Sequence, residues 1–381
     1  MAERLIPYGR QWVDEADVAA VVDALCSDYL TTGPAVGAFE EALQSITGAG
    51  RAVVMNSGTS ALHAMYFGAG LQPGDEIVTS PLTFAATANA ALYLGARVRF
   101  ADVDPATGNL DPEAAEAQIN ERTRFIVAVD YAGHPADYDE LQRVAHARNI
   151  GLLADAAHSL GAKYHGRRVG TLCDASELSF HPVKPITTAE GGAVLTDDQE
   201  LADRAARFRT HGITRDPDIM ERSEGPWFYE MQELGFNYRM TDLQAALGRS
   251  QLRHLDQFIG RRRAIAARYL EAFADLSSLE LPSVLEGVEP GWHLFVIRVR
   301  HARRRRGMFE RLHELGIGVQ VHYVPVYRHP YYRRLGFSPG LCPVAEDFYA
   351  RAVSLPIFPR MSDAEVDVVI DGVRSLANEP A

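Results

Sequence analysis

The sequence predicts an α/β protein with a mainly parallel, seven-stranded sheet and a smaller C-terminal α/β domain. Short β-rich runs alternate with helical patterns from about residue 51 to residue 198, which is typical of parallel strands joined by crossover helices. The pattern changes after Gly235, where a long helical stretch follows. The composition, 47% hydrophobic and 23% charged over 381 residues, is that of an ordinary globular protein.

Seven runs are predicted as strands of the main sheet. They cover residues 52–55, 76–79, 97–101, 125–129, 151–154, 177–180 and 193–196. Four helices are predicted between them, at residues 59–69, 84–94, 112–119 and 138–148. Asp111 and Asp137 are predicted N-caps, because a carboxylate before the first turn can accept one of its free N–H groups.

The C-terminal third begins with a helical stretch over residues 241–276, opened by a Thr241 cap and interrupted by Gly248 and Gly260. Beyond it we expect a strand at 293–299, a helix at 304–315, a strand at 319–324, a tyrosine-rich loop and a closing helix at 364–377. The predicted division is a large domain over residues 1–250, including the N-terminal segment, and a small α/β domain over residues 251–381.

Charge and composition exclude several classes of protein. Lys and Arg number 38 against 50 Asp and Glu, a net charge of −12, which argues against a nucleic-acid binder. The three cysteines are widely spaced, so neither a disulfide framework nor a CxxC metal site is supported. We find no signal peptide and no apolar run of about 18 residues, so we expect a cytoplasmic protein without a membrane partner.

The chain contains two lysines, Lys163 and Lys184, and a nucleophilic amine must be one of them because arginine stays protonated. Lys184 follows a predicted strand in the segment ELSFHPVKPITTAEGG, between Pro182 and Pro185. Proline disfavours helix at the residue before it, so Lys184 is predicted to lie in a loop. A solvated loop lysine is the plainer interpretation of this residue alone.

Two further features change that interpretation. Asp155 ends a predicted buried strand, at the sheet edge where open α/β proteins bind ligands. A carboxylate there can keep a heterocyclic nitrogen protonated, as pyridoxal phosphate requires, although it could also be a helix cap or a salt-bridge partner. The segment NSGTSAL, residues 56–62, joins a strand to a helix and suits a phosphate, although such residues also cap many helices.

Together, the phosphate-binding turn, the strand-end Asp155 and the strand-end Lys184 describe an enzyme that uses pyridoxal 5'-phosphate. The fold that presents these groups in this order is the aspartate aminotransferase fold, fold type I. Ser179, five residues before Lys184, could add a hydroxyl to the phosphate site.

The chain also resembles the DegT/StrS-type nucleotide-sugar aminotransferases, nearly from end to end. The resemblance rests on LTTGPAVGAFEEAL, NSGTSAL, LLADAAHSLGA, SFHPVKPITTAEGG, GFNYRMTDLQAALGRSQL and VHYVPVYRHPYY. PYGRQ at residues 7–11 and the wording KPITTAEGG are most similar to the 4-aminotransferases of the pseudaminic acid pathway. Those enzymes act on a UDP-linked 4-keto-6-deoxy-N-acetylhexosamine and form UDP-4-amino-4,6-dideoxy-N-acetyl-altrosamine.

The resemblance implies a role for each matching residue. Lys184 would be the Schiff-base lysine and would move a proton as general base and acid, and Asp155 would pair with the pyridine nitrogen. His158 would contact the phenolic oxygen of the cofactor and Phe84 would stack on its ring. The residues implied to bind the cofactor phosphate are Thr59, Ser60 and Ser179.

The resemblance also implies partners. Asn237 would reach the phosphate from the neighbouring subunit, which makes the expected active unit a homodimer with shared active sites. The amino donor would be L-glutamate and the acceptor a nucleotide sugar. The residues implied to line the sugar pocket are Thr32, Gly33, His322 and Tyr323.

Several alternatives stay open at this point. Phe84 could be a core aromatic, and His158 could be a hydrogen-bonded histidine behind the site. His322 with His329 and Tyr331 could suggest a metal, but their segment has no carboxylate or cysteine at ligand spacing, so no metal is expected. A side branch of the family has histidine in place of the Schiff-base lysine and acts as a sugar dehydratase, so Lys184 favours transamination.

Three other functions compete with this expectation. One is an aminotransferase for another dTDP-, GDP- or UDP-linked keto sugar. Another is a dinucleotide-dependent oxidoreductase, but the nearest glycine pair, Gly48 and Gly50, precedes its strand, whereas a dinucleotide fingerprint follows one. The third is a non-catalytic regulatory protein that binds pyridoxal phosphate.

Overall fold

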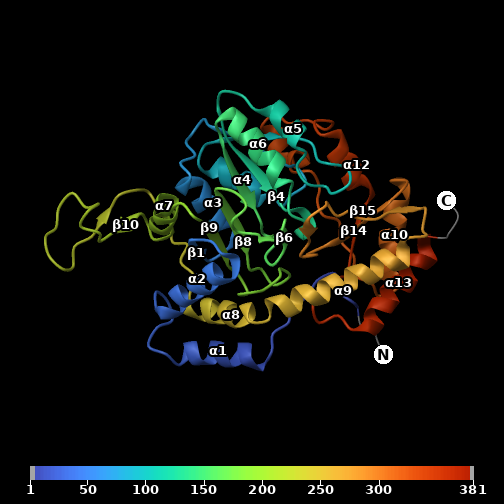
Figure 1. Ribbon diagram of the computed structural model, residues 1–381, viewed down its shortest axis with the longest axis horizontal. Helices are drawn as coiled ribbons and strands as arrows, with labels where there is room; N and C mark the ends of the chain where they lie inside the picture. Colours follow the sequence, from blue (N-terminus) through green and yellow to red (C-terminus); the bar gives the residue numbers. More distant parts are fainter. Residues whose placement is uncertain (1–4, 378–381) are drawn as a thin grey trace.

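The core of the protein is a seven-stranded sheet with the order β1-β9-β8-β5-β4-β2-β3 (Figure 1). The computed structural model describes residues 5–377. Neighbouring strands run parallel except at β9, which is antiparallel to both β1 and β8. The strands are β1 (Arg51–Met55), β2 (Glu76–Thr79), β3 (Arg97–Phe100), β4 (Thr123–Val129), β5 (Gly151–Asp155), β8 (Ala175–Ser179) and β9 (Gly192–Thr196). All seven predicted strands and the mainly parallel sheet are confirmed.

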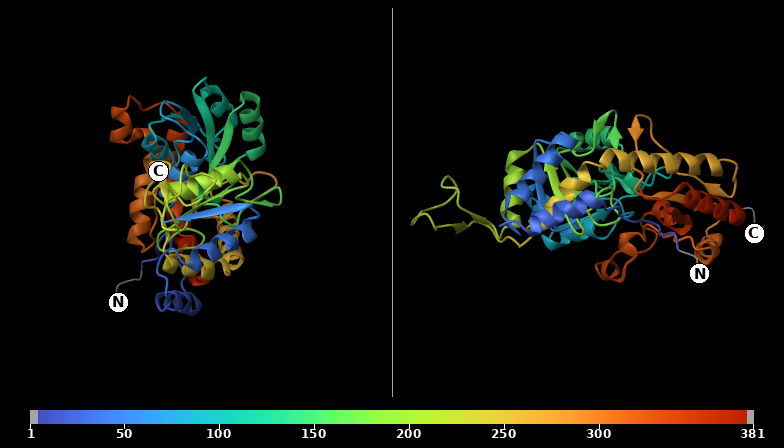
Figure 2. Two further views of the ribbon diagram at one scale, coloured as in Figure 1. Left: turned by 90° about the vertical axis from the view of Figure 1, so that its left-hand side faces the viewer. Right: turned by 90° about the horizontal axis from the view of Figure 1, so that it is seen from below.

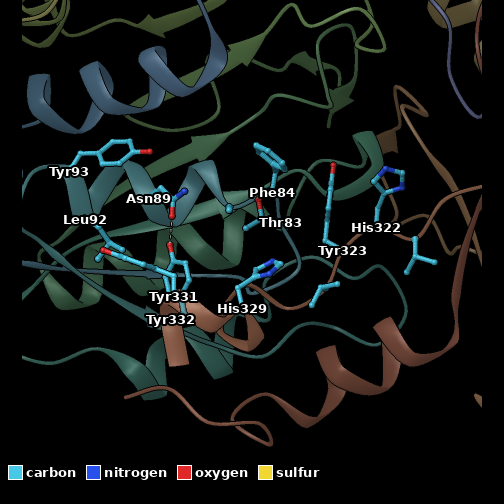
Figure 3. Close-up of a pocket in the computed structure, with 13 residues that line it drawn as sticks. Thr83, Phe84, Asn89, Leu92, Tyr93, His322, Tyr323, His329, Tyr331 and Tyr332 are labelled. Carbon is cyan, nitrogen blue, oxygen red and sulfur yellow. Dashed lines mark hydrogen bonds between the residues drawn. The ribbon is translucent and has the colours of Figure 1, made fainter. Parts of the chain in front are cut away.

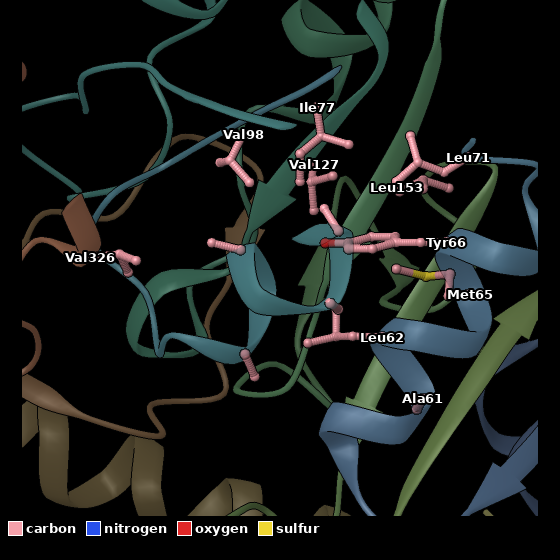
Figure 4. Close-up of a cluster of buried hydrophobic side chains, with 14 of the residues drawn as sticks. Ala61, Leu62, Met65, Tyr66, Leu71, Ile77, Val98, Val127, Leu153 and Val326 are labelled. Atoms are coloured by element: carbon pink, nitrogen blue, oxygen red, sulfur yellow. The ribbon is translucent and has the colours of Figure 1, made fainter. Parts of the chain in front are cut away.

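Helices cover both faces of this sheet because its strands alternate their side chains between two apolar cores. In β4, Val127 points to one core, while Ile126 and Ala128 point to the other. Helices α3 (Gly58–Gly68), α4 (Ala86–Tyr93) and α7 (Gln199–Arg209) pack on the first face. On the second face lie α2 (Pro34–Thr47), α5 (Pro112–Gln118), α6 (Tyr138–Arg148) and α8 (Asp242–Leu252). Figure 4 shows Met65 and Tyr66 of α3 packed beside the strands of the first face.

Side-chain caps fix the starts of these helices. Asp111 accepts a hydrogen bond from Ala114 N at 2.8 Å, and Asp137 accepts one from Glu140 N at 3.3 Å. Thr241 and Gln244 form a reciprocal capping box at the start of α8. All three predicted caps are therefore confirmed. A further helix, α1 (Glu15–Leu25), packs against α8.

The long helical stretch divides differently from the prediction. It forms α8 and α9 (Leu255–Phe273), and the break lies at residues 253–254. The prediction that Gly248 and Gly260 interrupt the helix is wrong. A Cβ atom on Gly248 would lie 2.5 Å from Phe39 Cζ, so this glycine lets α8 approach α2 closely. Gly260 is exposed on α9 with no atom within 4 Å of the place its Cβ would take.

The C-terminal part contains a three-stranded antiparallel sheet, β12-β14-β15, formed by β12 (Leu279–Glu280), β14 (Phe295–Val299) and β15 (Ala352–Leu355). Its helices are α10 (Arg303–Glu314), α11 (Pro330–Arg334), α12 (Pro343–Arg351) and α13 (Asp363–Ala377). The predicted strand at 319–324 is wrong: this segment makes one bridge, between Gln320 and Ser354. β15 takes the place beside β14, and the segment continues as an irregular chain.

Helix α9 belongs to two cores at once. Ile259 packs in the second core of the main sheet, whereas Ile265 packs in the core of the C-terminal part. Arg262, between them, is 1% exposed and donates hydrogen bonds to the carbonyls of Ile357 at 2.8 Å and Val183 at 3.3 Å. The domain division at residue 250 stays a prediction, and its residues 1–4 and 378–381 lie outside the described range.

An arm extends from the body between α7 and α8 (Figure 2). It includes β10 (Ile213–Thr214) and β11 (Glu230–Met231), which pair with each other. Several large apolar side chains on it are exposed, among them Trp227 at 70% and Leu234 at 80%. The remaining short elements are β6 (Lys163–Tyr164), β7 (Arg167–Arg168), β13 (Val288–Glu289), η1 (Tyr131–Gly133) and η2 (Val326–Arg328). Within residues 5–377, no helix combines the length and the apolar character needed to cross a bilayer.

Candidate active site

Lys184 lies in a turn at the carboxyl end of β8, as predicted. Its backbone N–H donates to His181 O at 2.9 Å, and Pro185 after it stops any helix. Burial of the ammonium group lowers the pKa of Lys184 from 10.5 to about 8, and attraction to Asp155 and Glu177 opposes this shift. The amine of Lys184 therefore loses its proton at a lower pH than an ordinary lysine, and about a tenth of it is neutral at pH 7.

Lys163 has a different environment. It lies in the β6–β7 hairpin, and its Nζ forms an ion pair with Glu289 at 3.3 Å. The hairpin is a separate small sheet with β13 rather than part of the main sheet. Of the two lysines, Lys184 is the one beside buried carboxyl groups at the strand ends.

Asp155 is the last residue of β5 and is buried. Its Oδ2 accepts a hydrogen bond from Thr87 Oγ1 at 2.5 Å, and its Oδ1 accepts one from Ala157 N at 3.2 Å. Thr83 Oγ1 lies 2.7 Å from Thr87 Oγ1, so a chain of hydroxyls leads to the carboxylate. The carboxylate is thus held in one orientation, as a partner for a protonated ring nitrogen needs to be.

The segment predicted to bind the phosphate is the N-terminus of α3. Ser57 is the N-cap, and the first intrahelical bond runs from Ala61 N to Ser57 O, so the amides of Gly58 and Thr59 precede it. An anion is favoured at this end by those amides and the helix dipole. Ser179, on the neighbouring β8, lies against this turn: a Cβ on Gly58 would be 3.1 Å from Ser179 Oγ.

Ser60 has a structural task in the same turn. Its side chain and that of Ser57 form a capping box, and Ser60 Oγ also donates to Asn56 Oδ1 at 2.8 Å. The Ser60 hydroxyl is therefore already engaged within the protein, whereas Thr59 is partly exposed at the start of the helix. Sequence reasoning grouped the two residues, but the structure gives them different surroundings.

His158 lies in the turn after β5 with Tyr323 beside it. Tyr323 Oη is 3.2 Å from His158 Nε2, and the two rings stack with centroids 6.1 Å apart. His158 Nδ1 is buried and has no hydrogen-bond partner in the described part of the chain. Burial, followed by the charge of Lys184, holds the pKa of His158 well below its ordinary value, so the ring is neutral.

Phe84 is 63% exposed, which excludes the core-aromatic interpretation. It lines a cavity of about 730 Å³ between the start of α4 and residues 321–332 (Figure 3). His322 and Tyr323, which the resemblance implies for the sugar pocket, line the same cavity. The other main lining residues of this cavity are Asn89, Tyr93, His329, Tyr331 and Tyr332.

Three predicted site residues are not among those that line this cavity. Thr32 and Gly33 precede α2, where Gly33 N donates to Asp242 Oδ2 at 2.9 Å. Asn237 lies at the base of the arm, and its backbone carbonyl is 3.5 Å from Asn56 Nδ2. Their predicted roles toward substrate and a neighbouring subunit stay predictions.

Two candidate functional residues were not predicted from the sequence. Thr87 is the hydroxyl donor to Asp155, and its four-residue spacing from Thr83 was the available signal. Glu177 is a buried glutamate on β8, two residues before Ser179 and therefore on the same face of the strand. A charged residue in the middle of a strand of the main sheet, ASELS, was a signal available in the sequence.

The residues present fit pyridoxal 5'-phosphate. His158 Nδ1 and both carboxyl oxygens of Glu177 are buried polar atoms without partners among residues 5–377, and they surround Lys184 and Asp155. A helix N-terminus suited to a phosphate lies at the same sheet edge. The fold and site define a fold type I enzyme dependent on pyridoxal 5'-phosphate.

Comparison with known proteins gives the family. The DegT/DnrJ/EryC1/StrS aminotransferase family matches residues 11–374, and the chain belongs to it. The chain is 38% identical to the UDP-4-amino-4,6-dideoxy-N-acetyl-beta-L-altrosamine transaminase of Campylobacter jejuni, over 98% of this chain and 97% of that protein. The protein is therefore an aminotransferase, and the oxidoreductase and regulatory interpretations find no support.

Solved structures agree with this assignment. The chain is similar to Helicobacter pylori PseC, an aminotransferase involved in the biosynthesis of pseudaminic acid, with a TM-score of 0.92 and 35% identity over 98% of this chain and 99% of that one. It is also similar to the pyridoxal-phosphate form of a putative sugar aminotransferase, Spr1654 of Streptococcus pneumoniae, with a TM-score of 0.92 and 30% identity over 98% of each chain. The cofactor is pyridoxal 5'-phosphate.

Proposed function

We propose that the protein transfers the amino group of L-glutamate to the C4 ketone of a UDP-linked 4-keto-6-deoxy-N-acetylhexosamine. The product would be a UDP-4-amino-4,6-dideoxy-N-acetyl-altrosamine, formed in the cytoplasm. The observation that carries this proposal is the meeting of Lys184 and Asp155 beside an aromatic cavity of about 730 Å³. The names of the relatives in Campylobacter jejuni and Helicobacter pylori support the choice of sugar.

We assign the cofactor site as follows. Asp155 pairs with the ring nitrogen, and Thr87 holds its carboxylate in place. His158 contacts the phenolic oxygen through its free Nδ1, and Phe84 covers the ring. The phosphate is bound by the first turn of α3, with the groups of Thr59, Ser60 and Ser179. Because the Ser60 hydroxyl is engaged in the cap, its contribution is to shape the turn.

The bound cofactor supplies an electron sink for the carbon that carries the nitrogen. Lys184 is the group that moves the proton at this carbon. With a pKa of about 8, its Nζ can accept the proton in one half-reaction and return it in the other near neutral pH. Neutral His158 and Tyr323 border the same space and leave Lys184 as the basic amine there.

The aromatic cavity is the proposed sugar-nucleotide site. Figure 3 shows Tyr323 and His322 on one side and Tyr93, Tyr331 and Tyr332 on the other. Tyr332 Oη donates to Asn89 Oδ1 at 2.6 Å, which fixes that ring. Flat aromatic faces with polar edges suit a pyranose ring and a nucleobase.

We further propose a homodimer with shared active sites. The arm between α7 and α8 exposes Trp227 and Leu234, which a single chain leaves uncovered. Asn237 lies at the base of this arm, and Thr32 and Gly33 lie near the start of α8. In this proposal Asn237 reaches the phosphate of the neighbouring subunit's site, and Thr32 and Gly33 line the sugar pocket.

The test is a turnover assay with L-glutamate and a panel of UDP-, dTDP- and GDP-linked 4-keto sugars, with the product configuration read by NMR. We expect the UDP-linked N-acetylhexosamine to give the highest kcat/KM. Turnover of a dTDP- or GDP-linked sugar instead would contradict the proposed substrate. Lys184→Ala should abolish turnover, and the matched control Lys163→Ala should retain it because the Nζ of Lys163 pairs with the exposed Glu289 in a separate small sheet.

A further inference from the structure

Glu177 is a second carboxyl group at the centre of the site, besides Asp155. Its side chain is 1% exposed, on the fully buried part of β8. Neither of its carboxyl oxygens receives a hydrogen bond from a donor among residues 5–377. An ionised carboxylate in such a place would carry a large desolvation cost with no hydrogen bond to offset it.

The position of Glu177 relates it to both halves of the cofactor site. It is the register partner of Asp155 on the neighbouring strand β5, and Ala156 N donates to Glu177 O at 2.9 Å. On the other side it reaches the first turn of α3: a Cβ on Gly58 would lie 2.6 Å from Glu177 Oε1. The carboxyl group therefore lies between the Asp155 carboxylate and the phosphate-binding turn.

The titratable groups that face Glu177 belong to three elements of the fold. β5 contributes Asp155, the turn after β8 contributes Lys184, and α3 contributes the hydroxyl of Tyr66. On the other flank, β9 places the apolar Val194 opposite it. Burial raises the pKa of Glu177 well above its ordinary value of 4.5; repulsion from Asp155 adds to the shift and attraction to Lys184 opposes it.

We propose that Glu177 is a positioning residue that stays protonated at neutral pH and donates its carboxyl hydrogen to the Asp155 carboxylate. The two carboxyl groups then share one negative charge. Asp155 gains a third donor besides Thr87 and Ala157, and the phosphate-binding turn is spared a second anion. The inference rests on the proposed pairing of Asp155 with the ring nitrogen.

The first test uses stability against pH in the full-length holoenzyme at fixed protein concentration. The unfolded chain releases the Glu177 proton near its ordinary pKa of 4.5, whereas the folded chain keeps it, so wild-type stability falls as pH rises toward the folded pKa. Glu177→Gln removes this dependence. Relative to that of the wild type, the unfolding equilibrium constant of the variant should fall by up to about tenfold for each pH unit above about 4.5.

Glu76→Gln is the matched control. Glu76 is also a buried strand glutamate, but it is ionised and paired with Arg122 at 2.9 Å. Hydrogen bonds from Asn120 and Arg122 outweigh its burial and lower the pKa of Glu76, so its contribution is present above the ordinary pKa and lost as pH falls. Glu76→Gln should therefore be less stable than the wild type at neutral pH. If Glu177→Gln behaves like Glu76→Gln, Glu177 is ionised and the proposal is wrong.

Infrared spectroscopy of the holoenzyme reads the proton directly. We expect a protonated-carboxyl carbonyl band at neutral pH that Glu177→Gln removes and Glu76→Gln retains. A spectrum in which Glu177→Gln changes nothing would overturn the proposal. Neither this measurement nor the stability profile requires the nucleotide sugar, so a wrong substrate assignment would leave both results unaffected.

The last test concerns the link to Asp155. Glutamine can still donate a hydrogen to Asp155, whereas leucine cannot. We expect Glu177→Gln to keep the cofactor dissociation constant within about threefold, and Glu177→Leu to weaken it about tenfold or more and to shift the pH midpoint of the bound cofactor's absorption. Equal behaviour of the two variants would refute the hydrogen bond between the carboxyl groups.

Discussion

Thr87→Val is the substitution that best tests how the protein holds Asp155. Valine has the shape of threonine but lacks the hydroxyl that donates to Asp155 Oδ2 at 2.5 Å. Thr87 is fully buried, so water cannot easily replace this donor. A hydrogen bond to a charged group contributes about 1.5 to 3 kcal/mol, which corresponds to about 10- to 150-fold in a rate or an equilibrium constant.

The assay is the glutamate half-reaction at saturating cofactor, followed by the loss of the visible absorption band in a stopped-flow instrument. We expect Thr87→Val to slow this step by about tenfold or more, because the carboxylate loses its shortest hydrogen bond. Thr79→Val is the control: it removes an equally buried hydroxyl that donates to Val127 O at 2.8 Å, away from Asp155. It should cost about 1 kcal/mol of stability and leave the half-reaction within about twofold. A half-reaction in Thr87→Val as fast as in Thr79→Val would refute the reasoning.

Two further predictions use internal controls. In cofactor-free protein, an amine-reactive reagent followed by mass spectrometry should modify Lys184 with a pH midpoint near 8, with Lys163 as the reference; a Lys184 midpoint near the ordinary 10.5 would contradict its burial. Gly248→Ala should destabilise the protein by about 1 to 3 kcal/mol, because its Cβ would lie 2.5 Å from Phe39 Cζ. Gly260→Ala, on the exposed face of α9, should stabilise it by about 0.5 to 1 kcal/mol. Denaturant unfolding measures both free energies, and a stabilised Gly248→Ala or a destabilised Gly260→Ala would contradict the corresponding prediction.

The main sheet could be predicted from the sequence because its strands are short apolar runs whose period sets them apart from the helices between them. The structure of the C-terminal part was harder to predict from the sequence. Residues 319–324 have the composition of a strand, but β15 at residues 352–355 occupies the place beside β14, and such long-range pairing leaves no local signal. Gly248 was misjudged for a similar reason, since its role depends on Phe39, far away in the chain.

The residues of the site also divide into those that could be predicted from the sequence and those that could not. Lys184 and Asp155 were predictable because their residue types and strand-end positions already suggest chemistry. Thr87 and Glu177 were missed because each acts through Asp155, and only the folded chain shows which side chains meet there. Phe84 needed its exposure to decide between a core residue and one that faces a ligand.

The hydrogen bonds of Arg262 have a mechanical consequence. Its guanidinium connects the helix that spans both cores to Ile357 in the C-terminal part and to Val183, the residue before Lys184. A swing of the C-terminal part as a free hinged lid would have to break these bonds or drag the lysine turn with it. The small unit and the turn that carries Lys184 are therefore coupled, so a rotation of the whole unit would move the reactive amine with it.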